Sequence, residues 1–209
     1  MSCLSKSRKT VPAGKMNREV RPESGAIRNQ EKFELTEELV LRVVARIREY
    51  MREQREEYLC IGKPLERGQV AVMKPFFSST FLASVKVVQL VGRRIAEPSC
   101  CMEARAAGFH GLPEFTHLAS VTFQEVLVFN DKITERLLFQ SLVRSVQFQV
   151  LGFDRYVESF IRAFLATRWL FSVPLEAHAF ELESKFATDR KRAFSVEDDV
   201  RMRVSQHRY

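Results

Sequence analysis

Residues 137–148 read LLFQSLVRSVQF, and Leu151-Gly152-Phe153 follow. The apolar positions of this stretch recur at the spacing of one helix face, and Thr134-Glu135 before it and Gly152 after it are typical start and stop signals. These features predict a helix over 134–151 whose apolar face comprises Leu137, Leu138, Leu142, Val143 and Val146. Gln140, Arg144 and Gln147 share a second stripe by their spacing of four and three. That stripe either faces solvent, as polar helix residues usually do, or forms a site.

The same stretch resembles the active-site helix of small bacterial zincin-like metallopeptidase domains, which reads L-L-F-H-E-L-V-H-V-V-Q-Y and then L-G. The segment PLEAHAF at 174–180 is similar to the family's P-x-E-x-x-A-Y segment, which supplies a third, glutamate ligand. GFHGLP at 108–113 and the apolar run 121–129 resemble the loop and edge strand that precede the metal helix. The resemblance covers residues 82–186 and implies a gluzincin-type fold.

All three positions of the family's His-Glu-x-x-His motif differ in this chain. Gln140 stands at the first histidine ligand, Ser141 at the general-base glutamate and Arg144 at the second histidine. Gln is a poor zinc ligand, Ser cannot replace a carboxylate base, and Arg brings a fixed positive charge to the place of a dication. The resemblance therefore implies a zincin-like domain without catalytic residues and without zinc or another cofactor.

Glu176 occupies the position that the resemblance assigns to the third metal ligand. A buried carboxylate without a counter-charge is costly, and Arg144 could supply the missing cation. We therefore hypothesise an Arg144–Glu176 ion pair, braced by Gln140 and Gln147, as a structural link between two helices. The alternative is that Arg144 points to solvent and Glu176 is an ordinary helix acid.

The rest of the chain predicts an α+β fold, with a small antiparallel sheet packed against a helix-rich, zincin-like C-terminal half. Helices are expected over 36–59, 100–107, 134–151, 153–167 and from 174 past 186, and strands over 82–91 and 121–129. A single domain is expected over 34–190, followed by a polar C-terminal tail at 191–209.

The net charge of +7 invites a nucleic-acid interpretation, but the charge is unevenly distributed. Residues 1–33 hold eight of the basic and three of the acidic residues, so this stretch carries +5 of the total. We expect a disordered basic leader there, ahead of a near-neutral body that is unlike a nucleic-acid-binding surface. No stretch has the apolar length of a secretory signal or a membrane span, so a cytoplasmic protein is expected.

The cysteines and histidines offer little metal chemistry. Four cysteines without a C-x-x-C pair make disulfides and a cysteine-based zinc site improbable on spacing. An alternative candidate metal site consists of His110, His117 and Glu176.

Three kinds of function remain open. The first is an inactive zincin-like module that binds a peptide or protein in a groove beside strand 121–129, or acts as a scaffold. The second is a metal-dependent hydrolase with a relocated site. Association with nucleic acid through the leader is a further alternative. The sequence names neither the partner nor the oligomeric state.

Overall fold

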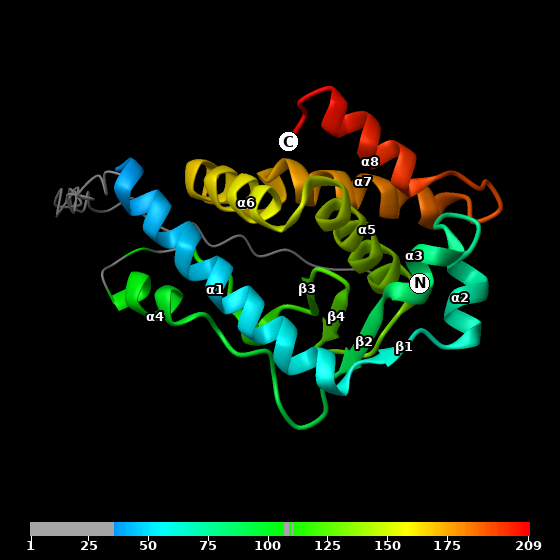
Figure 1. Cartoon of the computed structure of the whole chain (residues 1–209), viewed down its shortest axis with the longest axis horizontal. Coiled ribbons are helices and arrows are strands. Elements are labelled where there is room, and N and C mark those ends of the chain that lie inside the picture. Colours follow the sequence, from blue (N-terminus) through cyan, green and yellow to red (C-terminus); the bar gives the residue numbers. More distant parts are fainter. Residues whose placement is uncertain (1–35, 107–108, 110) are drawn as a thin grey trace, which may run out of the picture. The chain divides into compact units, whose positions relative to one another are not determined.

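The computed structural model describes residues 36–106, 109 and 111–209, so the predicted leader lies outside the described residues. The elements are α1 (Glu37–Ile61), β1 (Lys63–Pro64), α2 (Arg67–Met73), α3 (Ser79–Ser84), β2 (Lys86–Gln89), α4 (Ser99–Ala106), η1 (Phe115–His117), β3 (Ser120–Phe123), β4 (Val126–Phe129), α5 (Glu135–Leu151), α6 (Phe153–Thr167), η2 (Leu170–Ser172), α7 (Pro174–Thr188) and α8 (Val196–Ser205). Helices predominate over one small sheet (Figure 1), which confirms the α+β prediction.

The four strands lie in the order β1-β2-β4-β3. β1 pairs with β2 and β3 with β4 in antiparallel fashion, but β2 and β4 run parallel, with Val87 opposite Leu127. The prediction of an antiparallel sheet was therefore wrong for the central pair. The long connection through α4, η1 and β3 carries the chain back to the starting end of β2 before β4 begins, as a parallel pair requires.

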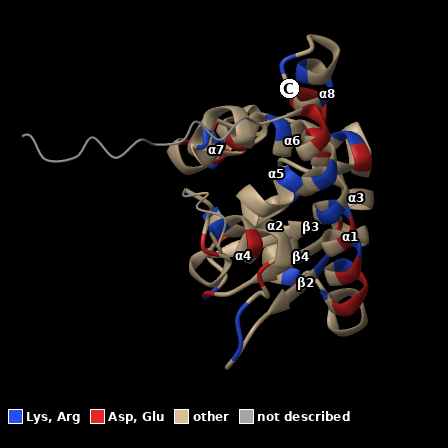
Figure 2. Cartoon of the chain, turned by 90° about the vertical axis from the view of Figure 1, so that its left-hand side faces the viewer, with Lys and Arg blue, Asp and Glu red and all other residues tan. Residues whose placement is uncertain are grey.

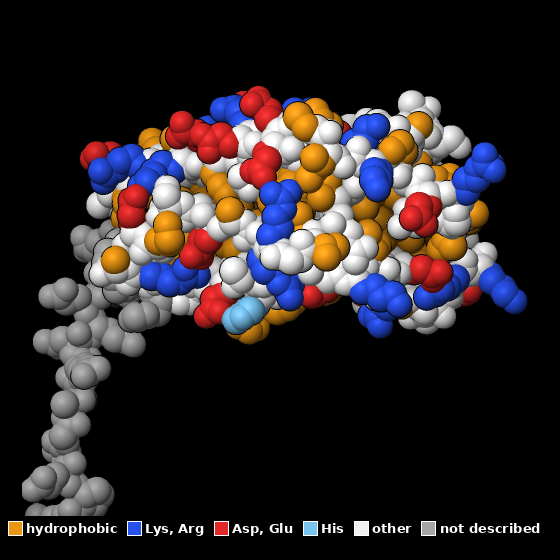
Figure 3. Space-filling model, turned by 90° about the horizontal axis from the view of Figure 1, so that it is seen from below, with side chains coloured by type: hydrophobic (Ala, Val, Ile, Leu, Met, Phe, Trp, Pro, Cys, Tyr) orange, Lys and Arg blue, Asp and Glu red, His pale blue; other side chains and the backbone are white. Residues whose placement is uncertain are grey.

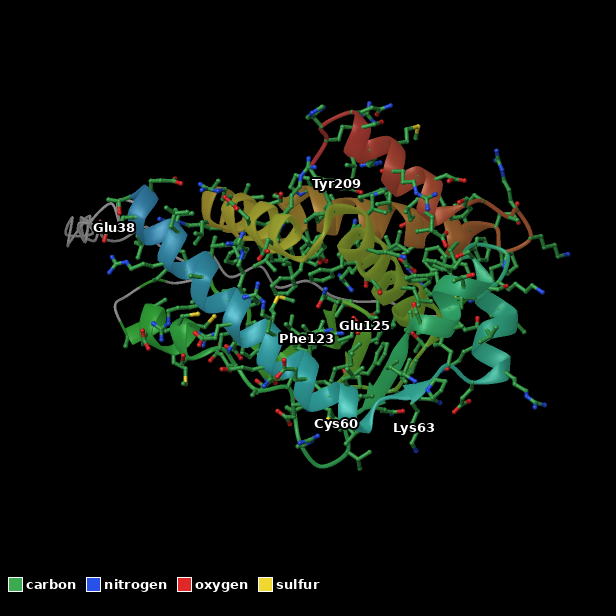
Figure 4. The ribbon with its side chains drawn as sticks, in the orientation of Figure 1. Glu38, Cys60, Lys63, Phe123, Glu125 and Tyr209 are labelled. Atoms are coloured by element: carbon green, nitrogen blue, oxygen red, sulfur yellow. The ribbon has the colours of Figure 1, made fainter. Side chains whose placement is uncertain are left out.

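Helices α1 and α5 contact opposite faces of the sheet. On one face, the Phe123 ring lies 6.0 Å from the Tyr50 ring and 5.8 Å from the Tyr58 ring of α1, centroid to centroid. Figure 4 shows Phe123 beside this helix. On the other face, the Thr122 hydroxyl donates to the Ser141 carbonyl of α5 at 3.4 Å. Neighbouring strand residues point to opposite faces, so β3 contributes to both layers.

Two predicted strands differ from the structure. The segment expected as a strand over 82–91 begins inside α3, because Ser78 caps that helix by accepting from the Phe81 N–H at 3.3 Å. Only Lys86–Gln89 is extended. The segment expected as one strand over 121–129 is a hairpin that turns at Gln124, whose φ is 58°. A turn without Gly or Asn leaves little signal in the sequence.

The predicted polar tail at 191–209 contains α8 instead. Ser195 caps this helix by accepting from the Asp198 N–H, and the helix buries Val196 and Val200 in the same apolar cluster as Leu142 and Phe139 of α5. Val196, Val200 and Val204 recur at helical spacing, but the many charged residues around them give the segment a polar composition, which led to its prediction as a tail. The C-terminal segment therefore belongs to the folded unit.

Candidate functional site

Helix α5 carries the residues that the sequence singled out. Thr134 accepts from the Leu137 N–H at 3.2 Å at its start, and Gly152, with φ 80°, ends it in a conformation that favours glycine. Gln140 and Gln147 are buried and the Arg144 side chain is 14% exposed, so the stripe formed by these three residues faces the interior and not solvent. The helix is enclosed because α7 and α8 cover the side that the sheet leaves open.

The predicted ion pair is present. Arg144 donates from Nε to Glu176 Oε1 at 2.8 Å and from Nη2 to Oε2 at 2.7 Å, which is a bidentate geometry. The side chains of Arg144 and Glu176 are 14% and 5% exposed. Burial acts to lower the pKa of Arg144, but the charge and hydrogen bonds of Glu176 outweigh burial, and the pKa is raised. The pair joins α5 to the start of α7.

Only one of the two predicted braces is made. Gln147 donates from Nε2 to the Leu175 carbonyl at 3.0 Å and so fixes the residue next to Glu176. Gln140 has no hydrogen bond to the pair, and its Nε2 is buried without a partner among the described residues. Arg144 Nη1 is also buried without a partner there. The helix thus holds two buried donors, one turn apart, that lack an acceptor in the described part of the chain.

Ser141, at the position that the resemblance gives to the general base, has a structural role. Its hydroxyl lies 3.0 Å from the Ser120 hydroxyl of β3 and donates to the Leu137 carbonyl at 2.9 Å. Both oxygens of Ser141 therefore contact β3, since its carbonyl accepts from Thr122. The serine holds the edge strand against α5, and its hydroxyl has no carboxylate partner among the described residues.

A cavity of about 480 Å³ lies between α1, α4, α6 and β3, and the Arg144–Glu176 pair forms part of its wall. Most of the wall is apolar and includes Val43, Ile47, Leu112, Val121, Phe160 and Ile161. Tyr156 of α6 also lines it, and burial first and then the Glu176 charge raise the pKa of its phenol. The volume and apolar lining are typical of small-ligand pockets.

The cavity also reaches the outer edge of β3, since Ser120 to Phe123 line it. The Asn130 N–H donates to the Ala119 carbonyl at 2.9 Å across the β3–β4 ladder. In an antiparallel strand, the backbone N–H and C=O groups of successive residues point alternately toward and away from the neighbouring strand. The backbone groups of Val121 and Phe123 therefore point toward β4, and those of Ser120 and Thr122 point away from it. The outward backbone groups of Ser120 and Thr122 have no partner within the described residues.

The structure describes two of the three residues of the alternative metal site. His117 is exposed and its Nδ1 lies 2.7 Å from Glu114 Oε2, while Glu176 is held by Arg144 and His110 lies outside the described residues. Among residues 36–106, 109 and 111–209, no group of three or more His, Cys, Asp or Glu side chains could hold a metal ion. The structure does not bring His117 and Glu176 together as ligands.

Sequence reasoning missed a polar cluster between α7 and α8. His178 is fully buried, its Nε2 lies 2.9 Å from Asp199 Oδ1, and its Nδ1 contacts the Tyr209 hydroxyl. Burial and then the positive charge of Arg203 lower the pKa of His178, against the opposing effects of Asp199 and Glu181. No spacing links residue 178 to residues near 200, so this cluster had no signal in the sequence. It also lies outside the cavity lining.

Charge on the described surface is mixed in sign. Figure 2 shows basic and acidic positions interspersed along α1, and the view from below in Figure 3 shows Lys and Arg side chains alternating with Asp and Glu. The charges visible in these views are interspersed and do not form the basic stripe typical of a phosphate-binding site. In the described part of the chain, no helix has both the length and the apolar character needed to cross a bilayer.

Comparisons with known proteins found no matching family model, no similar curated protein and no similar solved structure.

Proposed function

We propose that this chain is a catalytically inactive, zincin-like module that binds an extended segment of a partner protein. The observation that carries the proposal is the bidentate Arg144–Glu176 pair, which joins the helix and the glutamate that the resemblance assigns to metal binding. A guanidinium at this place neutralises Glu176 as a metal ion would. It also opposes entry of a dication by charge repulsion.

The arrangement around the pair supports binding and not catalysis. Gln140 makes no hydrogen bond to Glu176, Ser141 is engaged with Ser120 and Leu137, and Glu176 itself is held by Arg144, so the described residues offer no free carboxylate beside the pair to activate water. The pair instead fixes α5 to α7 and thereby holds one wall of the cavity. A rigid wall favours recognition, because less conformational freedom is lost on binding.

The outer edge of β3 supports an extended partner. A strand laid beside Ser120 and Thr122 would pair with backbone groups that have no other partner in the described residues. Side chains of that strand would alternate between the α1 side and the α5 side, and the cavity adjoins both. This is the mode of binding that best uses both the strand edge and the cavity.

Restoring the metal motif tests the assignment. The triple variant Q140H/S141E/R144H of the full chain places two imidazoles one turn apart, with Glu176 as the third ligand. We expect stoichiometric zinc in this variant by titration calorimetry and by elemental analysis after dialysis. The matched control is E49H/E53H, which creates two histidines at the same spacing on the exposed face of α1, away from Glu176.

The outcomes separate the alternatives. A folded triple variant that binds zinc no more tightly than E49H/E53H would refute the zincin-like placement of α5 and α7. Wild-type protein that purifies with stoichiometric, chelator-removable metal would refute the metal-free module and favour the relocated hydrolase. Zinc in the triple variant and none in wild type supports the proposal.

A further inference from the structure

The charged side chains along the described cavity wall are almost balanced. Arg144 and Glu176 form the inner pair, and Arg46 donates from Nη2 to Glu103 Oε1 at 2.7 Å between α1 and α4. The remaining charged residue in this lining is Arg42, which is exposed. The buried part of the cavity therefore presents no net charge to a ligand.

A charged group that entered the cavity would lose its hydration without gaining a counter-charge. Glu176 already uses both oxygens on Arg144, and Arg144 uses Nε and Nη2 on Glu176. A carboxylate placed there would meet Glu176 as a like charge, and an ammonium would meet Arg144. An uncharged group pays neither penalty and gains contact with the apolar wall.

We propose that the cavity accepts an uncharged, apolar side chain of the partner segment, and that the Arg144–Glu176 pair is the element that rejects charged groups. This proposal rests on the proposed function only in taking the ligand to be a side chain of a bound peptide segment. The selectivity for uncharged groups is argued from the cavity wall alone.

Three probes with the same ten-carbon chain test the selectivity: decanol, decanoate and decylammonium, each titrated into the full chain at pH 7 by calorimetry. Wild type should bind decanol at least about tenfold more tightly than either ion, a modest ratio for an uncompensated charge in an apolar site. Tighter binding of either ion, or no binding of decanol, overturns the proposal.

Any apolar site favours an alcohol, so the decisive comparison is between variants. E176Q leaves the charge of Arg144 uncompensated, and decanoate should then bind more tightly than decanol. R144Q leaves Glu176 uncompensated, and decylammonium should then bind most tightly. An order of affinities that is unchanged in a folded E176Q or R144Q variant overturns the proposal.

Further variants test whether the probes bind in this cavity. They also provide a test of charge selectivity if neither E176Q nor R144Q folds. A104L should weaken all three probes, because Ala104 lines the cavity, whereas A187L at an exposed position of α7 should not. A104K adds a cation to the wall without touching the pair and should raise decanoate affinity at least about tenfold relative to decanol. An A104K variant without this change refutes charge selectivity, whereas failure of the zinc test would refute only the zincin-like placement.

Discussion

The stability of the Arg144–Glu176 pair gives the most direct test of its role. Replacing Arg144 by Met keeps much of the apolar volume but leaves the 5% exposed Glu176 carboxylate without its two hydrogen bonds. Breaking a buried ion pair on one side costs about 3–5 kcal/mol. For an ordered unit of this size, that loss corresponds to a decrease in Tm of about 6–20 °C.

The double variant R144M/E176L separates the cost of the unpaired charge from that of the pair itself. Replacing both partners of a buried pair by apolar residues is often neutral or stabilising, so the double variant should recover most of the stability lost in R144M. Thermal and urea unfolding, followed by circular dichroism, give the free energies of unfolding of wild type, R144M, E176L and R144M/E176L, which form the double-mutant cycle.

The control is R201M, which breaks the exposed pair between Arg201 and Asp198, whose side chains are 62% and 73% exposed. Exposed pairs contribute less than about 1 kcal/mol. If R144M loses no more stability than R201M, the Arg144–Glu176 pair is not a structural link. If R144M/E176L is as unstable as R144M, the unpaired carboxylate is not the cause of the loss.

Three other sites yield predictions. Because the pKa of buried His178 is lowered, the unfolded chain binds a proton at this residue more readily than the folded chain does. The free energy of unfolding should therefore decrease as pH falls below about 6.5. Urea unfolding at several pH values should show a smaller decrease of this free energy in H178Q than in wild type. T122P removes an outward N–H of the edge strand together with the hydrogen bond from Thr122 to Ser141, whereas T122V removes only that hydrogen bond, so phage-displayed peptides selected on wild type should lose binding to T122P and keep binding to T122V; retained binding by a folded T122P variant would exclude strand pairing. The hydrogen bond between Cys101 and Cys100 lowers the pKa of Cys100 and raises that of Cys101. Iodoacetamide at pH 7.4 should therefore alkylate Cys100 before Cys101, as measured by peptide mass spectrometry, and equal rates for these two thiols would contradict this ordering.

The sequence predicted the helices well where local signals agree with tertiary packing. Helix α5 has a cap at Thr134, an apolar face and a stop at Gly152, and the structure places its bounds within one residue of the prediction. The hairpin at Gln124 and helix α8 were missed for different reasons. The hairpin turns at Gln124 and Glu125, which lack the Gly or Asn typical of a tight turn, whereas in α8 the charged residues between Val196, Val200 and Val204 obscure their helical spacing.

The candidate site was predictable only in part, because its members differ in how they are encoded. Arg144 and Glu176 could be paired from the sequence alone, since a resemblance placed both at one centre and charge chemistry supplied the rest. The cavity could not be predicted, because its wall combines α1, α4, α6 and β3, and no sequence pattern specifies how far apart packed helices lie. Tyr156 had no signal for the same reason.

The charges of Arg144 and Glu176 neutralise each other in the wall of the cavity. Glu176 would be an unsatisfied buried charge without Arg144, and the cavity would carry a net charge if either partner were missing. Under the proposed function, Gln140, Ser141 and Arg144 together leave no set of metal ligands on α5, and the pair keeps the buried part of the cavity wall neutral. The zinc test and the probe series examine these two properties separately.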